Sequence, residues 1–259
     1  MAVRQKTFDG ASKEPFKVSR SKIELFTQCP RCAYLDLKLG VKRPETPTFT
    51  LNNAVDALLK REFDTHRANG EAHPLMKTYG IDAIPYTHEK LDEWRENFKG
   101  IRYLHETTNL LVTGAIDDVW EDTVTGELFI VDYKATSKNK TITEDDLYDS
   151  YKQQMEIYQW LFRQNGFTVS PVGYFVSVNG KSDAKAFDAR LEFDVAVIPY
   201  RGSDAWVEPT LFRIKETLES DAIPPIGRAF RGGPCDYCTY REAAGKTFRA
   251  LTKHVKERK

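Results

Sequence analysis

Apolar residues recur every three or four positions in several stretches of the chain, and this spacing predicts amphipathic helices. The strongest example is residues 50–67, where one stripe contains Val55, Leu58, Leu59 and Phe63. The expected helices are residues 21–28, 30–39, 50–67, 143–165 and 204–220, together with part of 91–104.

Four other stretches have the short apolar runs or the alternating pattern of β-strands. They are residues 109–122, 126–135, 169–178 and 190–200. The first two are joined by a turn-rich segment near Thr123 and Val124, which predicts a β-hairpin. The order of helices, hairpin, helix, two strands and helix predicts one α/β domain over residues 1–259, with a mixed sheet flanked by helices.

The predicted strand 126–135 carries two charged residues on the same face near its end. Asp132 and Lys134 are separated by one residue, and alternate residues of a strand share a face. The hairpin brings a second carboxylate, from Asp117 or Asp118, beside Asp132. A local ion pair is the simpler explanation, because an acidic residue two positions before a lysine occurs four times in the chain. The other three occurrences have no such second carboxylate.

Neighbouring carboxylates repel each other unless a cation lies between them, and their hard oxygen atoms suit Mg²⁺ or Mn²⁺. A lysine on the same face can position a water or stabilise the charge of a phosphorane. Together these groups fit metal-assisted hydrolysis of a phosphodiester. Gln154 adds a polar side chain to the inward stripe of the 143–165 helix, one turn from Tyr158. A local backbone partner for this glutamine is the alternative.

The chain has 38 basic and 38 acidic residues, but the charges are unevenly distributed. Residues 1–22 carry six Lys or Arg against two Asp or Glu, and residues 227–259 carry nine against three, so the two ends are +4 and +6. Solvated tails are one interpretation of these ends. A basic surface that binds nucleic acid is the other.

No apolar run approaches the roughly 18–20 residues of a membrane span. The first residues also lack the apolar core of a signal peptide. We therefore expect a cytoplasmic protein with no membrane partner.

All four cysteines lie in two CxxC pairs, Cys29 with Cys32 and Cys235 with Cys238. Disulfides are not the expected use of cysteines in a reducing compartment. Two such pairs supply the four thiolates of a zinc site or of an iron–sulfur cluster. Four packed cysteines without a metal are the alternative. A shared metal site would join the N- and C-terminal segments and bring the two basic ends together.

Four short motifs, taken in order, resemble a known family. The stretches GAID at 114–117, VDYK at 131–134 and QMEIY at 154–158 resemble the G-x-I-D, D-x-K and Q-x-x-x-Y motifs of the PD-(D/E)XK nucleases. The segment SRSKIELFTQCPRCAYL at 19–35 resembles the N-terminal segment of the RecB-like branch, which includes the CRISPR-associated iron–sulfur exonucleases. The resemblance covers about residues 19–242 and implies a restriction-endonuclease-like core.

The resemblance also implies a set of metal ligands. Asp117 and Asp132 would bind the divalent ion, assisted by the backbone carbonyl of Tyr133. Asp118 remains an alternative to Asp117, because periodicity alone does not fix the strand register. The family usually supplies a further ligand from a histidine on an early helix. Asp56 stands at the matching position here, and an aspartate can bind the same hard cation.

The remaining motif residues would serve the reaction itself. By resemblance, Lys134 would be the catalytic lysine, and Gln154 and Tyr158 would position the strand to be cut. The implied activity is a metal-dependent exodeoxyribonuclease acting on DNA that is single-stranded or has free ends. Recombination or CRISPR-adaptation proteins would be its partners, in repair, recombination or CRISPR adaptation.

The cysteines depart from the family pattern. The relatives carry one early and three late cysteines, whereas this chain has two and two, so Cys32 would replace one late ligand. The resemblance implies an iron–sulfur (4Fe-4S) cluster, and structural Zn²⁺ is the alternative.

Two other functions fit parts of the pattern. One is a catalytically inactive nucleic-acid-binding or scaffold protein of the same fold. The other is a structural-zinc protein whose carboxylates are only surface pairs. The intact set of Asp117, Asp132, Lys134 and Gln154 favours the enzyme, because an inactive relative is expected to lose some of these residues.

Overall fold

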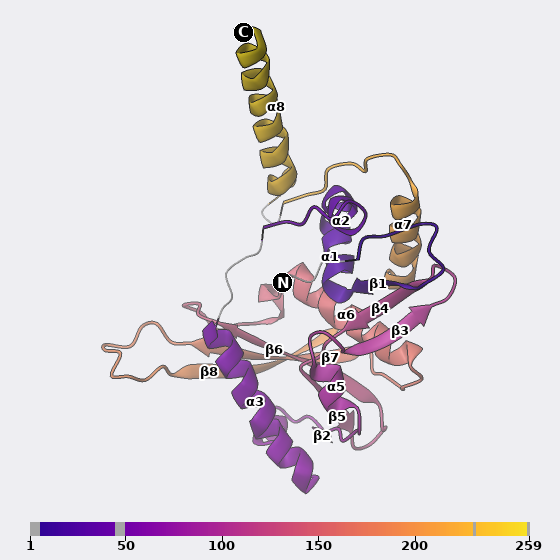
Figure 1. Ribbon diagram of the computed structural model, residues 1–259. Coiled ribbons are helices and arrows are strands. Elements are labelled where there is room, and N and C mark those ends of the chain that lie inside the picture. The colour runs from indigo at the N-terminus through magenta and orange to yellow at the C-terminus, as the bar shows by residue number, and fades with distance from the viewer. Residues whose placement is uncertain (1–5, 45–49, 230–231, 258–259) are drawn as a thin grey trace. The chain divides into compact units, whose positions relative to one another are not determined.

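The computed structural model describes residues 6–44, 50–229 and 232–257, the last five of these without their side chains (Figure 1). The chain divides into two compact units. One unit contains residues 1–46, 106–110 and 209–259, and the other contains residues 47–105 and 111–208. That the whole chain forms a single domain stays a prediction.

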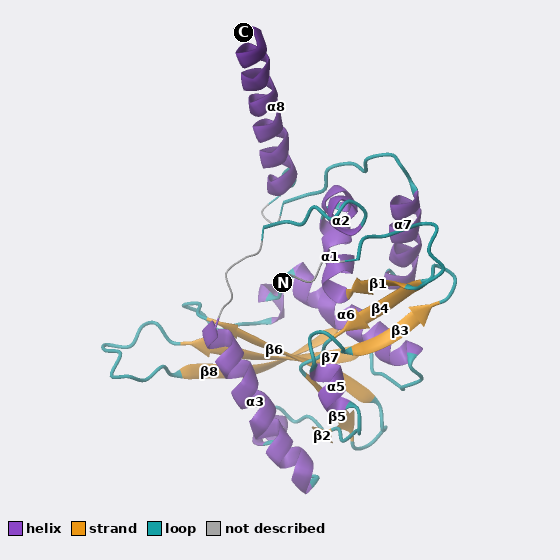
Figure 2. Cartoon of the chain, viewed as in Figure 1, coloured by secondary structure: helices purple, strands orange, loops and turns teal. Residues whose placement is uncertain are grey.

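A five-stranded mixed sheet forms the centre of the second unit (Figure 2). Its strand order is β2-β5-β6-β7-β8. The strands are β2 (Ala83–Pro85), β5 (Asp118–Asp122), β6 (Leu128–Thr136), β7 (Val172–Gly180) and β8 (Phe193–Arg201). The pair β6–β7 is parallel, whereas β2–β5, β5–β6 and β7–β8 are antiparallel. The predicted mixed α/β fold with flanking helices is therefore confirmed.

The register of the hairpin also agrees with the prediction. Asp118, the first residue of β5, pairs with Val131 in the interior of β6, next to Asp132. Strand β6 is the third of five strands, and its residues 128–133 are all buried. The charged pair of β6 is therefore held in the middle of the sheet and not on an edge.

Helix α3 (Thr50–Asn69) packs on one face of this sheet (Figure 1). Leu59 and Phe63 of the predicted apolar stripe join a core with Phe129, Val131 and Tyr133, the odd-numbered residues of β6. Leu58 does not, because its side chain is 59% exposed. The even-numbered residues of β6 point to the opposite face, which is where Asp132 lies.

Helix α6 (Asp149–Gln164) contacts β6 on the face that carries Asp132. The sequence predicted a single helix from Thr143, and this boundary is wrong. Thr143 instead begins a short 3₁₀ turn, η1 (Glu144–Asp146), in a capping box with Asp146. The buried Leu147 and the extended backbone of Tyr148 separate this turn from α6.

The predicted long strand 109–122 is two strands, β4 (Leu110–Gly114) and β5. Strand β4 lies beside β3 (Ile101–His105) in a second sheet. The chain changes sheets just after Gly114, where the Tyr158 ring packs against the backbone. A Cβ atom on Gly114 would lie 2.6 Å from Cε1 of Tyr158. The break leaves Asp117 between the two strands, outside the hydrogen-bonded ladder.

The first unit is built mainly from helices. They are α1 (Arg20–Gln28), α2 (Pro30–Leu37), most of α7 (Val207–Glu219) and α8 (Asp236–Glu257), with the strand β1 (Phe16–Ser19). The helices expected at 21–28, 30–39 and 204–220 are confirmed. The sequence analysis missed α8, β1 and β2, as well as α4 (Pro74–Thr78). It also missed β3, since only α5 (Leu91–Arg95) of the stretch 91–104 is helical.

Among the described residues, no helix combines the length and the apolar character needed to cross a lipid bilayer. The basic ends of the sequence include residues 1–5, 230–231 and 258–259, which lie outside the described residues. Their role in binding therefore stays a prediction.

The contact between Gly114 and Tyr158 gives a testable prediction. A Gly114→Ala substitution overpacks the interface between β4 and α6, and we expect it to lower the free energy of unfolding by about 1–3 kcal/mol. Urea unfolding measures this loss. Gly245→Ala is the control, because the nearest atom to its new Cβ lies 3.6 Å away in an exposed helix. Equal stability of the two variants would contradict the assigned packing.

Candidate functional site

Three polar side chains on the α6 face of the sheet form a closed set of contacts. Asp132 is fully buried, and its Oδ2 forms an ion pair with Nζ of Lys134. Nε2 of Gln154 donates to Oδ1 of Asp132 at 2.7 Å. Nζ of Lys134 donates to Oε1 of Gln154 at 3.4 Å. Gln154 therefore contacts both charged residues, and its partners are side chains and not the local backbone.

Lys134 keeps its positive charge in this environment. Burial alone would lower the pKa of Lys134, but the carboxylates of Asp132 and Asp117 raise it above its usual value. The Lys134 ammonium also lies 4.7 Å from the centre of the Tyr151 ring. At neutral pH this lysine is a cation that can stabilise negative charge, and it is not a general base.

Asp117 lies next to this set and is partly open to solvent. Its side chain is 23% exposed, and Oδ2 accepts a hydrogen bond from the backbone N–H of Tyr133 at 2.9 Å. Lys60 of α3 lies 3.4 Å from its Oδ1 and 2.9 Å from Oδ2 of Asp56. Burial and the charge of Asp117 raise the pKa of Asp56. Two neighbouring carboxylates thus share one ammonium ion, as expected for a position that attracts cations.

Asp118 has a different environment although it is the next residue. Its side chain is fully buried, and Oδ1 forms ion pairs with Arg67 and with Arg95, the latter at 2.9 Å. The backbone N–H of Val119 donates to the same oxygen, and the hydroxyl of Tyr133 donates to Oδ2 at 2.8 Å. Both oxygens of Asp118 are therefore occupied by protein donors.

Tyr133 connects the two aspartates. Its N–H holds Asp117 and its hydroxyl holds Asp118. Burial, together with the charge of Asp118, raises the pKa of Tyr133 well above its usual value, so the hydroxyl remains a donor. Tyr158 is also buried, and its hydroxyl accepts a hydrogen bond from Gln154 at 3.3 Å.

Four residues around the site were missed in the sequence analysis: Lys60, Asp64, Arg67 and Arg95. Nε of Arg95 donates to the backbone carbonyl of Asp117 at 3.0 Å, and its NH1 donates to both carboxylate oxygens of Asp64 at 2.9 Å. The helical spacing of Asp56 and Lys60, four residues apart, was a usable signal. No sequence spacing signals the contacts of Arg95, because they cross between elements.

The four cysteines form one buried cluster in the first unit. Their sulfur atoms all lie within 4.8 Å of one another, and three pairs are 3.5 to 3.7 Å apart. Among the described residues, the four cysteines are the group whose ligand atoms lie close enough together to hold a metal ion. The oxygen atoms of Asp56, Asp117 and Asp132 do not meet the same distance limit. The predicted convergence of the two CxxC pairs is therefore confirmed.

The backbone favours a thiolate at Cys29, whereas burial raises the pKa of the Cys32 and Cys238 thiols. Burial raises the pKa of the Cys29 thiol, but N–H donors from Cys32 and Gly227 lower it to about 7. Gly227 reaches Cys29 because it has no side chain, and a Cβ there would lie 2.2 Å from the carbonyl oxygen of Gln28. Arg43 donates to Sγ of Cys235 at 3.4 Å.

This donor set fits a metal. Four sulfur ligands with bonds of about 2.3 Å form a tetrahedron with edges of about 3.8 Å around Zn²⁺, close to the observed sulfur spacing. Four thiolates are also the ligand set of an iron–sulfur cluster. The buried site can thus bind zinc or an iron–sulfur cluster.

One comparison with known proteins identifies a family for this chain. A sequence model of the PD-(D/E)XK nuclease superfamily matches residues 17–243. No curated protein sequence matches the chain. A solved structure titled "Crystal structure of SSO0001" is similar with a TM-score of 0.43 and 13% sequence identity, covering 82% of this chain and 81% of that one. A likeness this distant carries no argument about function.

The contrast between the two adjacent aspartates predicts different effects on stability. Asp118→Ala leaves two buried arginines without their shared partner, and we expect a loss of about 3–5 kcal/mol in the free energy of unfolding. Asp117→Ala is the matched control, and the partly exposed position should cost less than about 1 kcal/mol. Urea unfolding without divalent metal measures both. Similar losses would show that the buried network is assigned to the wrong residue.

The cysteine cluster predicts that metal binding and stability are lost together. Cys32→Ser removes one of four ligands, and we expect the bound metal to be released and the free energy of unfolding to fall by more than about 4 kcal/mol. Elemental analysis and thermal unfolding provide the measurements. Ala33→Ser, the next residue and equally buried at 1% exposure, controls for a buried hydroxyl. Wild-type protein without metal would disprove the site.

Proposed function

The chain belongs to the PD-(D/E)XK nuclease superfamily, and we propose that it is a divalent-metal-dependent nuclease that hydrolyses phosphodiester bonds in DNA. One observation supports this most directly. Asp132, Lys134 and Gln154 contact one another on the α6 face of the sheet, and the backbone of Tyr133 holds Asp117 beside them.

The proposed ligands of Mg²⁺ or Mn²⁺ are Asp117, Asp132 and the backbone carbonyl of Tyr133, with Asp56 in the place of the family histidine. Their oxygen atoms are the donors that these hard cations prefer. Asp117 is a better candidate than Asp118, because its carboxylate is partly exposed beside the Lys60 ammonium, whereas Oδ1 of Asp118 is already held by two guanidinium groups. When bound, the metal supplies an activated water and stabilises charge on the phosphoryl oxygens.

The residues of the chain have separate proposed roles. Lys134 remains an ammonium and stabilises the negative charge that develops on the phosphate. Gln154 fixes Asp132 and Lys134 relative to each other, since it hydrogen-bonds to both. Tyr158 accepts from Gln154 and thereby orients its amide toward Asp132. The pair Gln154 and Tyr158 is also proposed to position the strand that is cut.

The finer assignment rests on the motif resemblance. We propose an exonuclease of the RecB-like branch that acts on single-stranded ends in repair, recombination or CRISPR adaptation, together with proteins of those pathways. The segment from Ser19 to Leu35 supports this branch, because it places a Cys-Pro-Arg after a Ser-x-Ser start.

We also propose that the four cysteines hold a structural metal centre. The resemblance supports an iron–sulfur cluster, whereas the spacing of the sulfur atoms supports a single zinc ion. Anaerobically purified protein that is brown and contains about four irons per chain identifies the cluster. Colourless protein with about one zinc per chain identifies the alternative.

A nuclease assay tests the proposed activity. End-labelled single- and double-stranded DNA and a closed single-stranded circle are incubated with Mg²⁺, Mn²⁺ or chelator. We expect metal-dependent loss of single strands with ends and survival of the circle. Cleavage of the circle would show an endonuclease. DNA binding without any cleavage would identify the inactive nucleic-acid-binding protein instead.

Substitutions in the same assay test the roles of individual residues. Asp132→Asn and Asp117→Asn should abolish cleavage, because each removes a charged ligand. Lys134→Ala should retain Mn²⁺ binding and reduce the rate about 10²- to 10³-fold. Lys99→Ala is the control, since this lysine is 54% exposed and pairs with Glu96. Full activity of Lys134→Ala would exclude the proposed charge-stabilising role.

A further inference from the structure

We propose that a surface extending from Lys134 through Tyr151 and Tyr148 to Lys138 binds one unpaired polynucleotide strand. In this proposal the two tyrosine rings stack on nucleobases, and Lys138 binds a backbone phosphate. The inference rests on the proposed function, because it identifies where the substrate strand continues beyond the site of cleavage.

Two neighbouring aromatic rings lie between two lysine ammonium groups along this surface. The ammonium of Lys134 lies 4.7 Å from the centre of the Tyr151 ring, and the Tyr151 and Tyr148 rings are 5.2 Å apart at 64°. The ammonium of Lys138 lies 4.9 Å from the centre of the Tyr148 ring. Each step is a direct contact, so the array is continuous from the proposed catalytic lysine outward.

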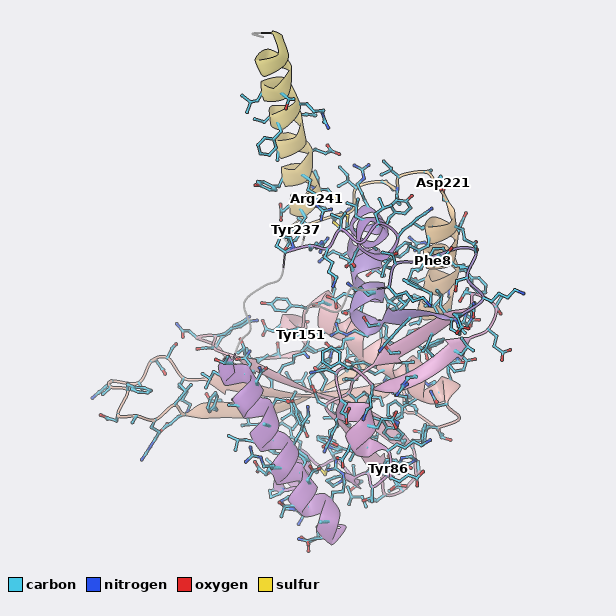
Figure 3. The ribbon with its side chains drawn as sticks, in the orientation of Figure 1. Phe8, Tyr86, Tyr151, Asp221, Tyr237 and Arg241 are labelled. Atoms are coloured by element: carbon cyan, nitrogen blue, oxygen red, sulfur yellow. The ribbon has the colours of Figure 1, made fainter. Side chains whose placement is uncertain are left out.

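The array is accessible to a ligand. The side chain of Tyr148 is 40% exposed, and Tyr151, which Figure 3 labels, is half-buried at the start of α6. Tyr148 adopts extended backbone immediately before the helix, between the short η1 turn and α6. The Tyr148 ring at this break is therefore accessible to a nucleobase.

A cavity of about 330 Å³ continues the surface beyond Lys138. Most of its lining residues directly follow β6 or β7. These two strands are parallel, so they end at the same edge of the sheet. Asn179 of β7 lines the cavity and holds the backbone of residues 138–140, which follow β6. Its Oδ1 accepts from the N–H of Lys138 at 2.7 Å, and its Nδ2 donates to the carbonyls of Lys138 and Lys140 at 2.9 and 3.1 Å.

Charge at the cavity identifies Lys138 as the main phosphate ligand. Lys140 and Lys181 also line it, but each is paired with a carboxylate, Asp146 and Asp194 respectively. A further carboxylate, Asp183, lines the cavity as well. The ammonium of Lys138 faces the Tyr148 ring, and Asp146, the carboxylate that acts on it electrostatically, is paired with Lys140, so Lys138 can bind a phosphate.

An unpaired strand fits this surface better than a duplex does. Stacking on an aromatic side chain requires a base whose face is open, and bases within a duplex are covered by their neighbours. In a single strand the bases can stack on the two tyrosine rings while backbone phosphates bind the lysines at either end of the pair. A duplex could use only the lysines.

Binding of labelled oligonucleotides tests the proposal. Fluorescence anisotropy is measured in chelator, where no metal-dependent cleavage occurs, with a single strand and with a duplex of the same sequence. Tyr148→Ala should weaken single-strand binding roughly tenfold, and Tyr148→Phe should restore it, because the ring is sufficient for stacking. Duplex binding should not change. Lys138→Ala should reduce the salt dependence of single-strand binding by about 0.7 in the log–log slope.

Matched controls lie elsewhere in the same unit. Tyr79 is 42% exposed and Lys99 is 54% exposed, so Tyr79→Ala and Lys99→Ala remove similar side chains away from the surface. Tyr151 is left unchanged, since its ring contacts Lys134. Wild-type affinity in both test variants, or equal weakening of duplex and single strand by Tyr148→Ala, would overturn the proposal.

The test separates this inference from the proposed activity. If the wild-type chain cleaves DNA but the variants bind like wild type, the strand-binding surface is wrong and the nuclease assignment stands. If the wild-type chain cleaves nothing but Tyr148 and Lys138 control single-strand binding as expected, the surface stands and the nuclease assignment fails.

Discussion

The carboxylate of Asp132 is fully buried in the central strand of a five-stranded sheet, where an unpaired charge is strongly destabilising. Its two oxygens are held by Lys134 from the same strand and by Gln154 from α6. This requirement explains why α6 presents a glutamine in an otherwise apolar stripe. It also explains why Lys134 lies inward although a lysine is normally exposed.

Two adjacent aspartates, Asp117 and Asp118, have different environments, because one is partly exposed and the other is fully buried. Asp118 begins β5 and points into a network with Arg67, Arg95 and the Tyr133 hydroxyl. Asp117 precedes the strand, and its carboxylate accepts from the N–H of Tyr133 and from the Lys60 ammonium. The break between β4 and β5 thus leaves the Asp117 carboxylate partly exposed beside the Lys60 ammonium.

The cysteine cluster joins two segments separated by about 200 residues, a closure that carries a large entropic cost in the unfolded chain. Sulfur atoms this close, together with N–H donors to Cys29, are consistent with a site made for thiolates. Binding of a metal there is coupled to folding of the first unit, because all four ligands belong to it.

The sequence alone determined the features that depend on local spacing. Period-two alternation placed Asp132 and Lys134 on one face, the turn near Thr123 brought Asp117 and Asp118 close to them, and two CxxC pairs predicted a shared site. Only the tertiary structure showed that Asp117 is partly exposed, whereas Arg67 and Arg95 surround Asp118. Those contacts join residues that are 51 and 23 positions apart, and no periodic pattern encodes them. They form because a buried carboxylate must find donors, wherever in the chain those donors lie.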